Sequence, residues 1–175
     1  LSFLSSVLRW GRYARQLDLP ERLALEARAS LAHRGLSTRG IERAREPTDD
    51  ELQRLFDHWQ SSDRQRIPME RICRFALASG MRLGEITRLL AADINARERT
   101  IVIHDRKDPK RKAGNDQTVP LLADAWAIVS PLLAEAEGGL IFPYPAASVS
   151  TAFTRACKAC GIEDLRFHDL RHRAT

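Results

Sequence analysis

Cysteine is scarce in this sequence of 175 residues, and long apolar runs are missing from it. The three cysteines, Cys73, Cys157 and Cys160, are few and odd in number, which favours a reducing compartment over a disulfide framework. No uninterrupted apolar stretch is long enough to span a bilayer, and the first residues lack the pattern of a secretory signal peptide. These absences predict a cytoplasmic protein that has no membrane partner.

The charge of the sequence is only mildly basic. Lys and Arg together number 28 against 23 for Asp and Glu, which gives a net charge of +5 at pH 7. Hydrophobic residues make up 43% of the chain, as is usual for a globular protein. Arginine is much more frequent than lysine, and guanidinium groups are the better bidentate ligands for phosphate. This composition permits a nucleic-acid partner without requiring one.

The spacing of apolar residues predicts a mainly helical protein with one small antiparallel sheet. Residues 99–104 and 117–121 are rich in β-branched and apolar side chains and predict two paired strands. Pro109 and Gly114 lie between them, in a segment that predicts a long basic hairpin loop. The predicted helices cover approximately residues 1–17, 21–33, 49–60, 68–79, 84–91, 122–136 and 145–160.

A polar, basic segment divides the chain. Residues 35–48 contain two glycines and a proline, so we expect one domain over 1–44, linker included, and a second over 45–175. The sequence begins with Leu, and its last residues complete no element, so we interpret it as a piece of a longer protein. For that reason we expect the residues after about 164 to be loosely held.

The first motif with chemical potential is SGMRLGEI, residues 79–86. Gly80 could end one helix and leave Arg82 at the start of the next, where free N–H groups help to bind a phosphate. Glu85, three residues later, could orient the guanidinium group of Arg82. The alternative is a solvated Arg–Glu pair at helical spacing, which stabilises a helix by only about 0.2–0.5 kcal/mol.

The second motif is the basic hairpin loop. A lysine in a mobile loop can reach a phosphate or protonate a leaving oxygen. The alternative is a solvated loop that contributes only positive charge. The candidates in this loop are Lys107, Lys110, Arg111 and Lys112.

The third motif is HDLRH, residues 168–172. In a helix, His168, Arg171 and His172 would share one face, which suits a phosphate that gains charge during a reaction. Two alternatives are a metal site and a helix start in which His168 is structural. The metal site is disfavoured because the cation of Arg171 would lie on the same face and no further ligand cluster is present.

The pair Cys157 and Cys160 has the C-x-x-C spacing. No second pair exists in the sequence, and the surrounding segment has helical apolar spacing. Two core-facing thiols are therefore favoured over a redox or zinc site.

The order of the three motifs resembles the catalytic domain of the tyrosine recombinases, the phage integrase family. The likeness covers about residues 46–175 and rests on SGMRLGEI, on a lysine-bearing hairpin with a V-P-L exit, and on HDLRH. Residues 1–34 look like the end of the helical core-binding domain that precedes the catalytic domain in this family and binds DNA. The resemblance implies the family's DNA breaking-rejoining fold, which is mainly α with a small antiparallel sheet.

The resemblance also implies roles for the residues that match the family's motifs. Arg82 and Arg171 look like the two arginines that hold the scissile phosphate, and His172 would donate a hydrogen bond to the same group. His168 matches the general acid/base that assists the nucleophile.

The remaining matches lie in the first motif and in the hairpin. Lys107 looks like the lysine that protonates the leaving 5′ oxygen, although Lys110 and Lys112 share its loop. Glu85 matches the acidic residue that supports the first arginine. Together with Arg111, the loop lysines at 110 and 112 are candidates for DNA binding.

The activity implied by this likeness is site-specific DNA recombination through a 3′-phosphotyrosine intermediate. It requires no metal and no cofactor. The expected partners are double-stranded DNA and further copies of the full-length parent, as a tetramer on DNA, in the cytoplasm of a bacterium or of a phage-infected cell.

The chain departs from the family pattern in its tyrosines. Tyr13 and Tyr144 are the only two, and neither lies in the position of the nucleophile, which follows the HDLRH box in the family. The later His or Trp of the family is also absent. We therefore expect the nucleophile beyond Thr175 and an inactive chain without it. Two alternatives are a catalytically inactive DNA-binding module and a nicking enzyme similar to type IB topoisomerases.

Overall fold

The computed structural model divides the chain into two units, Leu1–Arg43 and Ala44–Thr175. The division lies next to the boundary predicted from the polar segment. The residues that the structure describes are 2–20, 22–36, 43–62, 65–106, 114–136 and 139–174.

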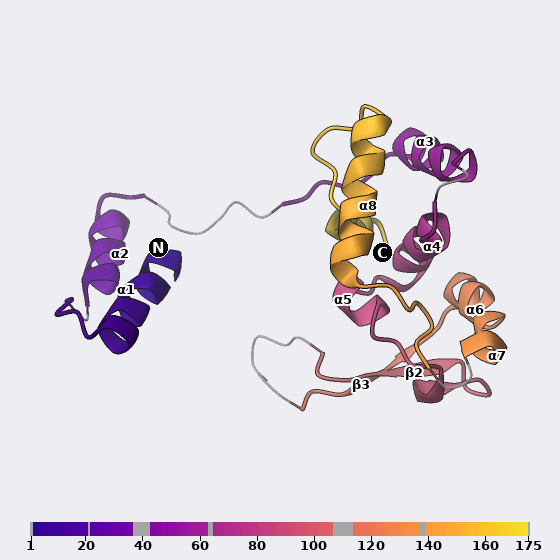
Figure 1. Ribbon diagram of the computed structural model, residues 1–175, viewed down its shortest axis with the longest axis horizontal. Coiled ribbons are helices and arrows are strands. Elements are labelled where there is room, and N and C mark those ends of the chain that lie inside the picture. The colour runs from indigo at the N-terminus through magenta and orange to yellow at the C-terminus, as the bar shows by residue number, and fades with distance from the viewer. Residues whose placement is uncertain are drawn as a thin grey trace. The chain divides into compact units, whose positions relative to one another are not determined.

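The first unit consists of two helices that contact each other, α1 (Ser2–Arg15) and α2 (Leu23–His33) (Figure 1). Both helices follow the predicted segments closely. Ala24 is buried between them, whereas Phe3 and Tyr13 of α1 are largely exposed.

The second unit begins with two helices whose ends follow from local sequence. Thr48 caps α3 (Asp49–Gln60) because its side chain accepts the backbone N–H of Glu51, and the carboxylate of Glu51 accepts the N–H of Thr48. The next helix, α4 (Met69–Ser79), ends at Gly80, whose φ of 61° suits glycine best. Both predicted helices are confirmed.

A three-stranded antiparallel sheet follows in the order β1 (Ile94–Asn95), β2 (Thr100–Ile103) and β3 (Gln117–Pro120). Its central strand buries Ile101 and Ile103 and leaves the alternate residues half-exposed. The hairpin of β2 and β3 was predicted. The strand β1 was not, because two residues are too few to show a period.

The predicted helix 84–91 is wrong in extent. It is reduced to α5 (Leu83–Ile86), and a short 3₁₀ turn, η1 (Ala91–Asp93), follows. Between these two elements, backbone groups form hydrogen bonds with residues 139–141. The carbonyl of Leu89 accepts the N–H of Ile141, and the N–H of Ala91 donates to the carbonyl of Gly139. Pairing with a distant segment therefore replaces the helical hydrogen bonds.

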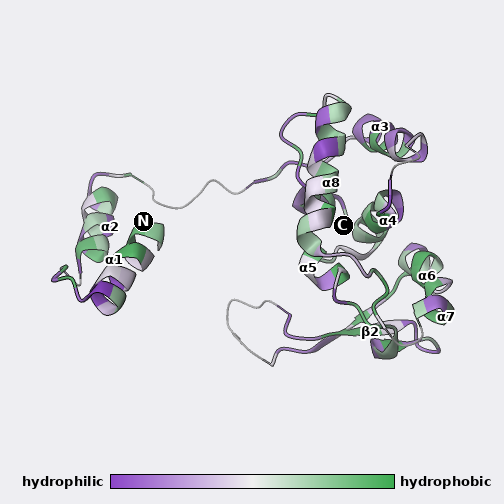
Figure 2. Ribbon diagram, in the orientation of Figure 1, coloured by the Kyte–Doolittle hydropathy of each residue, from purple (hydrophilic) through white to green (hydrophobic). Residues whose placement is uncertain are grey.

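The predicted helix 122–136 is also interrupted. It forms α6 (Ala123–Val129) and α7 (Leu132–Ala136), separated at Pro131. Proline has no N–H to donate inside a helix and clashes with the preceding turn. In Figure 2, α4 and α6, which pack on each other, carry apolar stretches.

The last two elements are α8 (Ala146–Ala159) and the 3₁₀ helix η2 (Phe167–Arg173). The expectation of a loosely held end is wrong. Phe167 packs edge-on against Phe153 of α8, with 5.5 Å between ring centroids, and Leu170 is completely buried. The second unit thus supplies its own cover for η2. Among the described residues, no helix is long and apolar enough to cross a membrane.

Candidate active site

Arg82 and Glu85 form one unit at the start of α5. Arg82 is the last residue before the helix and has an extended backbone. The carboxylate of Glu85, only 5% exposed, accepts hydrogen bonds from the backbone N–H of Arg82 at 2.9 Å and from its Nη1 at 2.8 Å. A buried carboxylate therefore fixes the guanidinium group. This geometry differs from that of a solvated surface pair.

A second guanidinium group shares the same carboxylate. Nε of Arg106 lies 3.6 Å from Oε1 of Glu85, the oxygen that also accepts Nη1 of Arg82. Burial on its own would raise the pKa of Glu85, but the hydrogen bonds from Arg82 and the charges of Arg106 and Arg82 lower it below the usual value. Glu85 is therefore ionised at neutral pH.

The other arginine of the site comes from η2, which starts with a similar arrangement. Asp169 is fully buried and accepts the backbone N–H of Arg166 at 2.8 Å, as Glu85 does for Arg82. Phe167 and Leu170 anchor the 3₁₀ helix in the core. Arg171 follows Leu170 directly, so its backbone is held by buried neighbours on the N-terminal side.

Arg171 holds a donor that the described part of the chain does not satisfy. Its Nη1 is buried and has no hydrogen-bond partner among the described residues. Burial lowers the pKa of Arg171, and the nearby positive charge of Arg82 lowers it further. Arg82 and Arg171 therefore lie close enough to repel each other, and an anion between them would relieve both costs.

The two histidines of the motif also lie together. The rings of His168 and His172 are 5.7 Å apart between centroids and stand edge to face. Partial burial lowers the pKa of His168, and the charges of His172 and Arg171 lower it further. His168 is therefore neutral at pH 7 and able to accept a proton, as a general base must.

The hairpin that carries the predicted lysine is braced at its base. His104 lies 2.9 Å from Asp116 and 3.2 Å from Asp93. One step further, the N–H of Arg106 donates to the carbonyl of Asn115 at 2.8 Å. The predicted loop residues themselves, Lys107, Lys110, Arg111 and Lys112, lie outside the described residues.

The sequence profile of the phage integrase family matches residues 47–175, about three quarters of the chain. The chain belongs to the phage integrase family. The family resemblance seen in the motifs is therefore confirmed.

Two curated relatives illustrate the similarity. The chain is 31% identical to a shufflon-specific DNA recombinase of Escherichia coli over 132 residues, which is 75% of this chain and 32% of that one. It is 29% identical to the integrase of Salmonella phage P22 over 135 residues, 70% of this chain and 33% of the relative. The chain thus spans about a third of the length of the curated relatives it matches.

The fold is that of the integrase catalytic domain. A crystal structure of a lambda integrase tetramer bound to a Holliday junction matches with a TM-score of 0.60 and 19% identity, over 87% of this chain and 50% of that one. The predicted fold class, mainly α with a small antiparallel sheet, is confirmed.

Arg106 was missed by sequence reasoning, which considered only its basic neighbours in the loop. Alternation along β2 would place His104 and Arg106 on the same face. Asp105, however, has a φ of 47°, which breaks the extended backbone, and the side chain of Arg106 turns to Glu85. A positive φ at a residue other than glycine leaves no clear signal in one sequence.

The cysteines do not form a second site. Cys157 is buried, and burial together with the neighbouring Cys160 raises the pKa of its thiol to about 11. Cys160 is half-buried and packs against the same hydrophobic core, as predicted for two core-facing thiols. Within the described ranges, no group of three His, Cys, Asp or Glu residues could hold a metal ion.

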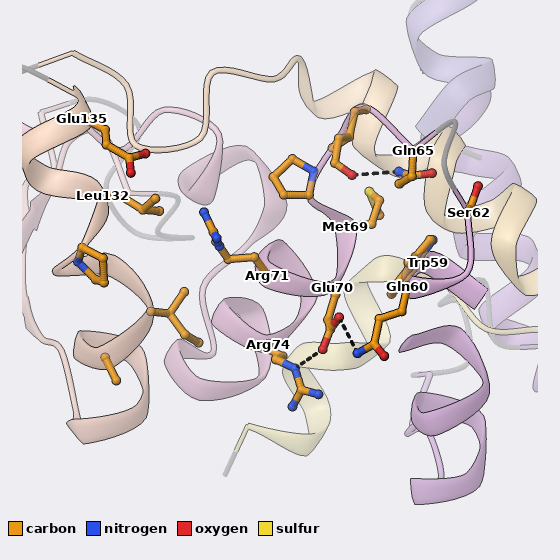
Figure 3. A pocket seen from close by; sticks show the side chains of 15 residues that line it. Trp59, Gln60, Ser62, Gln65, Met69, Glu70, Arg71, Arg74, Leu132 and Glu135 are labelled. Carbon is orange, nitrogen blue, oxygen red and sulfur yellow. Dashed lines mark hydrogen bonds and ion pairs between the residues drawn. The ribbon is translucent and has the colours of Figure 1, made fainter. Parts of the chain in front are cut away.

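A hollow of about 580 Å³ lies elsewhere in the second unit, between α4 and the α6–α7 pair (Figure 3). One of its two carboxylates, Glu70, accepts hydrogen bonds from Gln60 at 3.0 Å and from Arg74 at 2.8 Å. None of its lining residues belongs to the arginine and histidine cluster. The candidate active site is therefore the surface around Arg82 and Arg171 rather than this hollow.

His168 should titrate below pH 6.5 and His104 above it. The pKa of His168 is lowered by burial and like charges, whereas hydrogen bonds to Asp116 and Asp93 raise that of His104. A lowered pKa in the folded state means that the His168 contribution to stability is complete above the unfolded pKa and is lost as pH falls through the folded one. NMR titration of both imidazoles measures the two midpoints, and a His168 midpoint at or above 6.5 would contradict this geometry.

Replacing Arg171 by Met should leave the fold as stable or stabilise it, by up to about 1 kcal/mol, because a buried unsatisfied donor is removed. Arg173→Met is the matched control: Nη1 of Arg173 donates to the carbonyl of Pro47 at 2.7 Å and its guanidinium pairs with Asp49, so stability should fall. Urea denaturation compares the two variants. A larger loss for Arg171→Met than for Arg173→Met would mean that the fold itself satisfies Arg171.

Proposed function

We propose that this chain forms part of a site-specific DNA recombinase in which Arg82, Arg171 and His172 bind the phosphate that is cleaved. The observation that carries this proposal is Nη1 of Arg171, which is buried, has no hydrogen-bond partner within the described ranges and belongs to a guanidinium group on which the charge of Arg82 acts. Folded proteins rarely leave such a donor without an acceptor, and the exceptions commonly serve function. A DNA phosphate supplies acceptor oxygens and negative charge at once.

The charges of the cluster suit a phosphate whose negative charge grows. Arg171 is influenced by two further guanidinium groups, those of Arg82 and Arg106, and by the single carboxylate of Glu85. Three positive charges against one negative leave an excess of two for the bound group. Such fixed donors stabilise a pentacoordinate phosphorane more than the ground-state diester, because charge accumulates on its oxygens.

The proposed reaction forms a bond between a tyrosine oxygen and phosphorus and breaks the bond from phosphorus to the 5′ oxygen. Neutral His168 accepts or relays the tyrosine proton, and Lys107 donates a proton to the departing 5′ oxygen. The 3′-phosphotyrosine keeps the bond energy, so no nucleotide or metal is required. The reverse step, with a 5′-hydroxyl of another strand, completes strand transfer.

Neither tyrosine of this sequence is proposed as the nucleophile. Tyr144, which follows Phe142 and precedes α8 in the sequence, is half-buried and packs against the hydrophobic core. Tyr13 belongs to the first unit. The nucleophile is expected from residues that follow Thr175 in a longer parent.

Double-stranded DNA and copies of the same protein are the proposed partners. The lambda integrase that shares this fold is a tetramer bound to a Holliday junction. We propose that the parent of this chain also assembles as a tetramer on DNA. We further propose that the first unit, α1 and α2, belongs to a DNA-binding domain.

DNA binding by the 175-residue chain should depend on salt and on Arg82. Each phosphate contact adds about −0.9 to the slope of log K against log salt, so Arg82→Ala should weaken binding to every duplex and flatten that slope by about 0.9. Arg97→Ala is the control, since this equally charged side chain is 93% exposed in the turn before β2. Fluorescence anisotropy at several salt concentrations measures both slopes. Equal slopes for the two variants would contradict a phosphate contact by Arg82.

A nicked suicide substrate should trap no covalent adduct with the 175-residue chain. A parent that continues past Thr175 to a tyrosine should form one, and Arg171→Ala should reduce its yield by about a hundredfold or more, the order seen when one transition-state donor is removed. In that parent, Tyr144→Phe should leave the yield unchanged. An adduct with the short chain would overturn the placement of the nucleophile, and a parent that binds DNA without any adduct would indicate an inactive binding module.

A further inference from the structure

We propose that Arg106 is a positioning residue for the arginine pair: it forms an ion pair with the Glu85 oxygen that also holds Arg82, and so joins the hairpin to the site. The inference rests on the proposed function, because it concerns how the phosphate-binding arginines are set. Arg106 reaches Oε1 of Glu85 with Nε at 3.6 Å, while Nη1 of Arg82 holds the same oxygen at 2.8 Å.

Arg106 is itself firmly anchored. Its Nη1 donates to the side-chain oxygen of Gln117 at 3.0 Å, and only 20% of its side chain is exposed. Its backbone is held on both sides by Asn115, which is buried: the N–H of Arg106 donates to the Asn115 carbonyl, and Nδ2 of Asn115 donates to the Arg106 carbonyl at 2.9 Å. The two hydrogen bonds with Asn115 fix the backbone of Arg106, and the contacts with Gln117 and Glu85 fix its guanidinium group. The side chain therefore has little freedom to move toward a ligand.

The arrangement separates the tasks of the three arginines. Arg171 has a buried donor for which the described part of the chain offers no partner, and Arg82 keeps a third of its side chain exposed. Arg106, in contrast, is the less exposed of the two arginines on Glu85, and its Nε and Nη1 are directed to Glu85 and Gln117. Its effect on the phosphate is therefore indirect: it helps to lower the pKa of Glu85 and to hold the carboxylate in place, and so keeps Arg82 aligned.

The test uses duplex DNA binding by the complete 175-residue chain. Arg106→Gln should lower affinity about tenfold, the order expected when one partly buried ion pair that aligns Arg82 is lost. Because Arg106 makes no phosphate contact, the slope of log K against log salt should stay the same, whereas Arg82→Ala flattens it by about 0.9. A flattened slope for Arg106→Gln would make Arg106 a direct phosphate ligand and overturn the proposal, as would an unchanged affinity.

A second measurement excludes a general structural effect. The charged groups that face Glu85 are Arg82, Arg106 and Arg171, so the Glu85 carboxyl should titrate at higher pH in Arg106→Gln, as followed by ¹³C NMR. Arg106→Lys keeps the charge and should restore the low titration point but only part of the affinity, because one ammonium group cannot bridge Glu85 and Gln117. An unmoved Glu85 titration in Arg106→Gln would refute the coupling.

One control variant, Arg97→Gln, and the comparison with Arg82→Ala keep the possible outcomes distinguishable. Arg97→Gln, an equal change of charge at an exposed turn, should alter neither the Glu85 titration nor the affinity by more than a small factor. If Arg82→Ala behaves as expected and Arg106→Gln does not, the positioning role fails and the proposed function stands. If Arg82→Ala also leaves the salt dependence unchanged, the phosphate site itself is refuted.

Discussion

The buried carboxylate of Glu85 organises the candidate active site. It accepts two hydrogen bonds from Arg82, one from the backbone that opens α5 and one from the guanidinium group, and it also attracts Arg106 from the hairpin. Like charges brought together in this way would repel without a shared counter-charge. Because Glu85 is nearly inaccessible to water, its attraction is screened less than that of a surface ion pair. One carboxylate therefore makes it possible to gather positive charge at the site proposed to bind a phosphate.

Packing in the core brings the second half of the site to the first. Phe167 packs on Phe153 of α8, Leu170 is fully buried, and η2 contacts both α8 and α4. Arg171 thereby lies near enough to Arg82 for the two charges to act on each other. Gly80, at the end of α4, lies against Ala174: a Cβ added at Gly80 would come within 3.4 Å of the Cβ of Ala174. The positive φ of Gly80 favours glycine, whereas the contact with Ala174 is an ordinary van der Waals distance. The end of α4 and the end of η2 therefore lie side by side.

Much of this arrangement could be predicted from the sequence, because the signals were local. The capping pair Thr48 and Glu51 and the β-branched strand at 100–103 mark their elements in the chain itself. The motif residues Arg82 and Arg171 could be chosen for their chemistry and order, but nothing in the spacing shows that a donor of Arg171 is buried and lacks a partner among the described residues. The burial and the hydrogen-bond partners of these side chains are determined by long-range contacts.

Arg106 shows the same limit. Its role depends on the positive φ of Asp105 and on a carboxylate 21 positions away. The early end of α5 likewise depends on hydrogen bonds to residues 139–141, and the firm seating of η2 depends on an aromatic partner in α8. Such contacts join residues that are distant in the sequence, so neither periodicity nor propensity reveals them.

The central claim is that Arg82 and Arg171 hold one anion. Crystals of the chain soaked with selenate, an anomalous scatterer of phosphate-like shape and charge, test it directly. We predict a single anomalous peak within hydrogen-bonding distance of Nη1 of Arg171 and of the guanidinium group of Arg82, and its loss in Arg171→Met. Selenate bound to only one of the two arginines, or a protein carboxylate seated on Nη1 of Arg171, would contradict the claim.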